Sequence, residues 1–147
     1  KARFLDLINE IYDTYDKDAL TRWRPQPGVD SLLKHLSEKQ VPLAVCSNVG
    51  RKAMQGILAL LGWEKIFRTV ITRDDVVFLK PETEGLLKTA GILGLALSSI
   101  IFIGDSRTDF LTAREAGCSV IIVARGENTR KELEPLHPNY LFSSMDE

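Results

Sequence analysis

The sequence predicts an α/β domain in which helices cover both faces of a mostly parallel β-sheet. Its 147 residues, 44% of them hydrophobic and 27% charged, are typical of one globular domain. Short apolar runs of strand length alternate along the chain with segments of helix length. This alternation favours right-handed crossovers between parallel strands. Sheets of this kind bind ligands beyond the carboxyl ends of their strands, so we expect the functional residues there.

The chain is predicted to begin with a helix, a linker and a second helix. Apolar side chains recur at helical spacing from Ala2 to Asp16, so an amphipathic helix is expected there. Two prolines and a glycine then make residues 25–28 a stiff linker. The next helix is expected over Val29 to Ser37.

The rest of the chain alternates strands with helices. The β-branched apolar run from Val41 to Cys46 predicts a buried strand. By the same reasoning, strands are expected over residues 67–72, 100–103 and 120–123, and helices over residues 50–61, 82–90 and 106–116.

Composition narrows the classes of partner. The 19 basic and 20 acidic residues give a formal charge of -1, so no global charge excess attracts nucleic acid or an acidic membrane surface. The longest apolar stretch, Ile92 to Gly104, is shorter than the ~20 residues of a spanning helix. Cys46 and Cys118 lie inside apolar runs, which predicts reduced, buried thiols in a cytoplasmic protein.

Polar residues lie at two places near the predicted strand ends, directly after the strand at 41–46 and just before the helix at 82–90. Ser47 and Asn48 bring a hydroxyl and backbone N–H groups to the mouth of a helix, where they can hold an oxyanion. The simpler alternative is a helix N-cap. Further along, Pro81 keeps Lys80 out of helical geometry and suits the first position of the following helix.

Two acids follow the strand predicted over residues 100–103. Asp105 lies at the strand tip, and Asp109 lies one helical turn further on. Two neighbouring carboxylates are costly unless a cation joins them, and their hard oxygens favour Mg²⁺. The alternative is that Asp105 is an N-cap and Asp109 a first-turn acid favoured by the helix dipole.

The order of these motifs resembles that of a known family. Ser47-Asn48, then Lys80-Pro81, then Gly104-Asp105-Ser106-x-x-Asp109 are similar to the second, third and fourth motifs of the haloacid-dehalogenase-like hydrolase superfamily. The likeness is strongest to its phosphoglycolate-phosphatase and β-phosphoglucomutase branch. It extends over residues 27–29, 115–117 and 138–142, the last of which look like a closing strand. The resemblance implies a three-layer Rossmannoid core over residues 25–147, preceded over 1–24 by the last helix and linker of a helical cap.

The resemblance also implies roles for these residues. Ser47 and the Asn48 backbone would hold the transferring phosphoryl oxygens, and Lys80 would neutralise their charge. Asp105 and Asp109 would hold Mg²⁺. The implied activity is Mg²⁺-dependent hydrolysis of a small phosphorylated metabolite through an aspartyl-phosphate, and phosphoryl transfer needs this kind of positioning and charge neutralisation. The resemblance does not identify the substrate, because the cap confers specificity in this family.

The first motif of the family, an apolar strand ending in Asp-x-Asp-Gly-Thr, has no clear match. Asp16-Lys17-Asp18 is the only Asp-x-Asp, but it continues a helical pattern and is followed by Ala19-Leu20. We reject it as the nucleophile. We therefore expect the nucleophile strand, which is central in the family, and most of the cap to lie outside this sequence. An upstream segment or a second chain would supply them, and the strands on either side would carry apolar, unpaired edges.

Four other interpretations remain open. An isolated chain without its nucleophile is expected to be inactive, so it is either a non-catalytic fragment or a subunit of a split protein. A receiver-type binding domain would place its strand-tip acid before the Lys-Pro, whereas Asp105 follows Lys80. A Gly-Asp-Ser esterase would use Ser106 as nucleophile and His137 as base, but that motif normally opens its domain.

Overall fold

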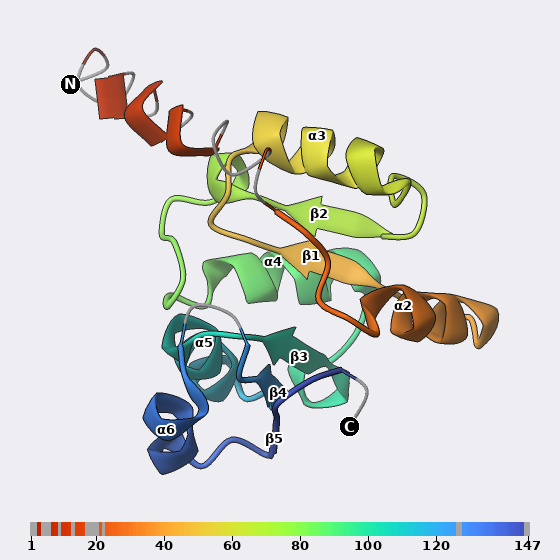
Figure 1. The fold of residues 1–147 in the computed structure, drawn as a ribbon. Coiled ribbons are helices and arrows are strands. Elements are labelled where there is room, and N and C mark those ends of the chain that lie inside the picture. The colour runs from red at the N-terminus through yellow and green to blue at the C-terminus, as the bar shows by residue number, and fades with distance from the viewer. Residues whose placement is uncertain are drawn as a thin grey trace.

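The structure, a computed structural model, describes residues 3, 7–8, 10–12, 14–16, 21, 23–125 and 128–145. Parallel strands alternate with helices along the chain, as Figure 1 shows. The elements are α2 (Val29–Glu38), β1 (Ala44–Cys46), α3 (Arg51–Leu61), β2 (Thr69–Ile71), α4 (Glu84–Leu93), β3 (Ile101–Gly104), α5 (Arg107–Ala116), β4 (Ser119–Val123), α6 (Arg130–Leu133) and β5 (Tyr140–Phe142). The predicted α/β class with parallel strands is confirmed. Of the helix predicted over Ala2 to Asp16, the described residues 3, 7–8, 10–12 and 14–16 are all helical, and the others lie outside the described residues.

Several boundaries differ from the predictions by one to three residues, and two of them bear on the site. β1 begins at Ala44 and not at Val41, because Pro42 has no N–H to donate to a sheet. α4 begins at Glu84, so the prediction that Pro81 occupies the first helical position is wrong. Residues 76–83 instead form a loop between β2 and α4 that carries Lys80.

The described strands form two separate parallel groups. β1 pairs with β2, with Cys46 opposite Ile71, and β3, β4 and β5 form the second group in that order. Within the described part of the chain, β1 pairs only with β2 and β3 only with β4, so each has one unpaired edge. α4 packs against β1, β2 and α5, and thereby joins the two groups (Figure 1).

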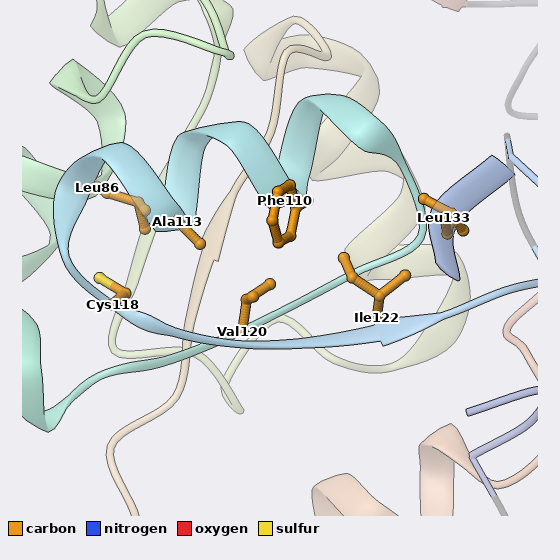
Figure 2. Close-up of a cluster of buried hydrophobic side chains, with 7 residues drawn as sticks. All are labelled: Leu86, Phe110, Ala113, Cys118, Val120, Ile122 and Leu133. Atoms are coloured by element: carbon orange, nitrogen blue, oxygen red, sulfur yellow. The ribbon is translucent and has the colours of Figure 1, made fainter. Parts of the chain in front are cut away.

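The tightest core lies between α5 and β4. Figure 2 shows Phe110 and Ala113 of α5 directed toward Val120 and Ile122 of β4. Leu86 of α4, Cys118 and Leu133 of α6 complete this cluster. Gly85 of α4 allows a close approach to β1, because a Cβ there would lie 2.7 Å from the Cys46 sulfur.

Burial is uneven between the two groups of strands. Ile122 of β4 is fully buried, whereas Ile101 and Ile103 of β3 are 60% and 38% exposed. All residues of β1 and α2 are described, and none of them is buried. β1 and β3, each of which has an unpaired edge in the described part of the chain, therefore have apolar side chains that are partly exposed to solvent. No helix in the described ranges is long and apolar enough to cross a membrane.

The α5–β4 core predicts a large effect on stability. Phe110 is 3% exposed, so Phe110→Ala should lower the free energy of unfolding by about 3–5 kcal/mol through lost burial and a residual cavity. Leu87→Ala is the control, because Leu87 is 52% exposed on α4 and should change stability by less than about 0.5 kcal/mol. Urea unfolding of both variants measures the difference. Equal effects would show that the core does not lie between α5 and β4.

Candidate active site

The candidate site lies where β1 and β3 end. The Ser47 N–H donates to the Ile71 carbonyl at 2.9 Å, so Ser47 extends the β1–β2 pairing by one residue. The Ser47 hydroxyl accepts the Val49 N–H at 3.2 Å. α3 takes Gly50 as its N-cap residue. The alternative in which Ser47 and Asn48 cap this helix is therefore wrong.

The Asn48 side chain bonds the backbone of Lys80 twice. Its Oδ1 accepts the Lys80 N–H at 3.0 Å, and its Nδ2 donates to the Lys80 carbonyl at 3.1 Å. These two residues are 32 positions apart in the chain. From the sequence, only the backbone of Asn48 was expected to have a role. Residue spacing within a single helix or strand cannot indicate a side-chain contact between residues so far apart in the chain.

The Lys80 side chain extends from the loop after β2 to Asp109 on α5, and so connects the two groups of strands. Its ammonium donates to Asp109 Oδ1 at 2.6 Å, and the two side chains are only 14% and 8% exposed. The same ammonium lies 5.5 Å from the centroid of the Phe102 ring on β3. Low exposure strengthens such an ion pair and also makes an unpartnered charge there costly. A cation is thus fixed at the carboxyl ends of β1 and β3.

Asp109 is held by the first turn of α5. Ser106 is the N-cap residue, so the alternative with Asp105 as N-cap is wrong. The Ser106 hydroxyl accepts the Asp109 N–H at 3.1 Å and donates to Asp109 Oδ2 at 2.8 Å. Oδ2 also accepts the N–H groups of Asp105 at 3.1 Å and Ser106 at 3.2 Å. A Cβ at position 104 would overlap the Asp109 side chain, which explains Gly104.

The carboxylates at this site suit a hard divalent cation. Asp105 directly follows β3, and its backbone N–H donates to Asp109 Oδ2 at 3.1 Å, so the two residues lie next to each other at the tip of the strand. In the described residues no cluster of three or more His, Cys, Asp or Glu side chains could hold a metal ion. Mg²⁺ is commonly bound by one or two carboxylates together with water and substrate phosphate, so two carboxylates match its requirements.

Cys46 lies beside this site without being activated by it. Burial raises the pKa of the Cys46 thiol, Lys80 lowers it and Asp109 raises it, with a net increase. Burial also raises the pKa of Cys118. Both cysteines are free thiols. A raised pKa keeps a thiol protonated, so Cys46 is a poor nucleophile at neutral pH.

The loop that carries Lys80 is held at its other end by Glu84. Glu84 Oε2 accepts the N–H groups of Val77 and Phe78, both at 2.9 Å, and Oε1 pairs with Lys88 at 2.7 Å. The hydrogen bond from Lys88, with those from Phe78 and Val77, lowers the pKa of the Glu84 carboxyl. The charged form of Glu84 is therefore the one that fixes this loop.

Asp16 lies at the N-terminus of α3, where it is bound to Gly50 and Arg73. Its Oδ2 accepts the Gly50 N–H at 2.9 Å and pairs with Arg73 at 3.1 Å. The Arg73 guanidinium also lies 4.8 Å from the centre of the Tyr12 ring. Tyr12 precedes Asp16 by one helical turn. Arg73 was not predicted as a site residue. It contacts Tyr12 and Asp16, which are four positions apart and share one helical face. Asp18, the other acid of this Asp-x-Asp, lies outside the described residues.

The esterase alternative does not fit the geometry. Ser106 is 4% exposed, and its hydroxyl is bonded to Asp109. His137 lies in an exposed position after α6. Burial and a carboxylate partner leave Ser106 as a capping residue and not as a nucleophile that a histidine activates.

Comparison with known proteins supports the resemblance stated above. The sequence pattern of haloacid dehalogenase-like hydrolases matches residues 1–123. A phosphoglycolate phosphatase from Yersinia pestis is 33% identical over 143 residues, which are 97% of this chain and 62% of that protein. The chain spans about half to three-fifths of the length of the curated relatives it matches.

Solved structures show the same fold. A predicted phosphoglycolate phosphatase from Haemophilus somnus 129pt superposes with a TM-score of 0.78 at 29% identity, covering 83% of this chain and 54% of that one. A protein from Bacteroides fragilis, described as a haloacid dehalogenase-like hydrolase, superposes with a TM-score of 0.84 at 26% identity. That match covers 95% of this chain and 69% of the other.

Proposed function

The chain belongs to the haloacid dehalogenase-like hydrolase family, and on this premise we propose that it forms the phosphate-binding and metal-binding part of a Mg²⁺-dependent phosphatase. The substrates would be small phosphate monoesters, hydrolysed through an aspartyl-phosphate. One observation carries the proposal: Asn48, the residue after Ser47, holds the Lys80 backbone, and Lys80 pairs with Asp109, so that a largely buried cation is fixed at this site. Phosphoryl transfer depends on this kind of fixed positive charge.

Each residue of the site has a distinct part in this chemistry. The Ser47 hydroxyl and the backbone N–H of Asn48 would donate to the phosphoryl oxygens, and the Lys80 ammonium would offset their negative charge. Asp109 holds Lys80 in place through its bond of 2.6 Å. Asp105 and Asp109 would hold Mg²⁺, which supplies further positive charge when bound.

The proposed nucleophile comes from a strand that pairs between β1 and β3. Both strands have an unpaired edge within the described part of the chain. Ile101 and Ile103 of β3 are also partly exposed. A strand with an unpaired backbone edge and exposed apolar side chains favours pairing with a further strand. The Asp-x-Asp of the sequence does not serve, because its Asp16 is bound to Arg73 and Gly50. An upstream segment or a second chain would carry the strand.

The second candidate function is that of a non-catalytic subunit or fragment of such a phosphatase. The same unpaired edges favour it, because a subunit of a split protein presents strand edges to its partner. The relatives that match along most of the chain are phosphoglycolate phosphatases, which favours a small phosphorylated metabolite as the ligand in either case. A cytoplasmic setting agrees with the two free thiols.

Metal binding tests the proposed function without requiring turnover. At about ten times Kd, Mg²⁺ should raise the Tm of the chain by about 2–5 °C, because a ligand of the folded state stabilises it by mass action. Asp105→Asn should abolish this shift, because it removes the charge that holds a hard cation. Differential scanning calorimetry with and without Mg²⁺ provides the measurement.

The matched control is Asp30→Asn, which changes an acid on α2. Asp30 accepts a bond from the Trp63 indole N–H, and asparagine retains an acceptor oxygen for it. This variant should keep the full Mg²⁺ shift. If Asp105→Asn also kept it, the metal site would lie elsewhere and the proposed function would lose its metal centre.

A further inference from the structure

We propose that Asn48 is a positioning residue whose side chain sets the Lys80 ammonium relative to the Ser47 hydroxyl. The inference rests on the proposed function in one respect, namely that Lys80 is the cation that meets phosphate. It departs from the role predicted from sequence, in which the Asn48 backbone alone acts. It also gives a physical reason for an asparagine directly after Ser47.

The carboxamide is matched to the backbone N–H and carbonyl of one residue. Its oxygen accepts the Lys80 N–H at 3.0 Å while its nitrogen donates to the Lys80 carbonyl at 3.1 Å. Two bonds to the same residue restrict rotation of its backbone as well as its displacement. Both polar ends of the Asn48 side chain are thus engaged by Lys80. Contact with a phosphoryl group is left to the backbone N–H of Asn48 and to its neighbour Ser47.

The two anchors of the loop differ in where they act. Glu84 fixes the N–H groups of Val77 and Phe78, and these bonds are exposed. The Asn48 bonds are partly buried and act on Lys80 itself. Glu84 therefore orders the start of the loop, whereas Asn48 fixes the residue that carries the charge.

The Lys80 side chain depends on such an anchor. Lysine has a flexible four-carbon stem, and holding its ammonium at one point costs conformational entropy. Here the ammonium meets Asp109 Oδ1 at 2.6 Å and lies over the Phe102 ring. Because the Lys80 backbone is already fixed, only the four-carbon stem loses conformational freedom when the ammonium reaches Asp109 and Phe102.

The first test observes Lys80 directly by NMR. The methylene signals next to its ammonium are assigned by their loss in Lys80→Arg, and the Phe102 ring shifts them away from those of exposed lysines. In Asn48→Ala these signals should move toward the exposed values, and Asn48→Asp should give an intermediate shift because it keeps only the acceptor. Asn139→Ala is the matched control: Asn139 Oδ1 also accepts a backbone N–H, that of Val120 at 2.9 Å. It should leave the Lys80 signals unchanged.

The second test measures affinity for inorganic phosphate by titration of the same samples. If Lys80 occupies its bound position about a tenth of the time in Asn48→Ala, the apparent Kd rises about tenfold. The double variant Asn48→Ala/Lys80→Ala should bind no more weakly than Lys80→Ala alone, because Asn48 acts through Lys80.

The outcomes separate the inference from the proposed function. Unchanged Lys80 signals in Asn48→Ala would overturn the positioning role, whatever the affinity for phosphate. Shifted signals in a chain that binds no phosphate would support the positioning role and contradict the phosphate site. A further loss of affinity in the double variant would show that Asn48 contacts phosphate independently and would also overturn the inference.

Discussion

Lys80→Ala should lower kcat at least about 10²-fold in protein that is supplied with a strand ending in Asp-x-Asp-Gly-Thr, the scale expected when a fixed electrostatic group is lost. Lys80 is the cation that the structure holds between the ends of β1 and β3, and its ammonium lies in a largely buried position. Without it, a carboxylate nucleophile and a phosphate dianion would repel each other in a site of low dielectric. The transition state would lose more stabilisation than the bound substrate.

Steady-state kinetics with a generic aryl phosphate measure this effect. Lys131→Ala is the control, because Lys131 lies in an exposed position on α6 and is not part of the hydrogen-bonded set of Asn48, Lys80 and Asp109. It should leave kcat within about twofold of the parent, as expected for a screened surface charge. Turnover by Lys80→Ala near the parent value would reduce Lys80 to a structural partner of Asp109.

Hydrophobic periodicity made much of the fold predictable from the sequence. Every strand and helix expected between Val29 and Val123 is present, and the boundaries shift by at most three residues. The shifts have local causes, such as the missing N–H of Pro42. α6 was not predicted, because its four residues are too few to establish a helical period.

The contacts that complete the site depend on residues far apart in the sequence. The Ser106–Asp109 capping box is a local signal, because its two residues are three positions apart. The Asn48–Lys80 bonds and the Asp16–Arg73 pair join residues 32 and 57 positions apart, and a single sequence carries no pattern for either. Most residues of the site were therefore predictable from the sequence, but the interactions that hold them were not.

The chain by itself should hydrolyse no phosphate ester above background. The Ser47 hydroxyl accepts the Val49 N–H, and the Ser106 hydroxyl is buried against Asp109. The raised pKa of Cys46 keeps its thiol protonated. Asp16 is bound to Arg73 and Gly50. None of these groups is an activated nucleophile at the ends of β1 and β3.

A peptide with an apolar strand that ends in Asp-x-Asp-Gly-Thr should restore turnover. Its backbone would pair with the free edges of β1 and β3, and its apolar side chains would cover Ile101 and Ile103. The first aspartate would then lie beside Lys80 and Ser47, where a transferring phosphoryl group meets both. A control peptide with Asn in place of that aspartate should pair equally well and give no turnover.

The most direct measurement is hydrolysis of an aryl phosphate with Mg²⁺ by the 147-residue chain, before and after addition of the peptide. The expected result is background hydrolysis without the peptide, measurable turnover with it, and loss of that turnover in Asp105→Asn. Robust turnover by the chain alone, lost in Asp105→Asn, would contradict the account. It would show that a nucleophile lies within this sequence, at Asp16 or Asp18, or that water attacks directly.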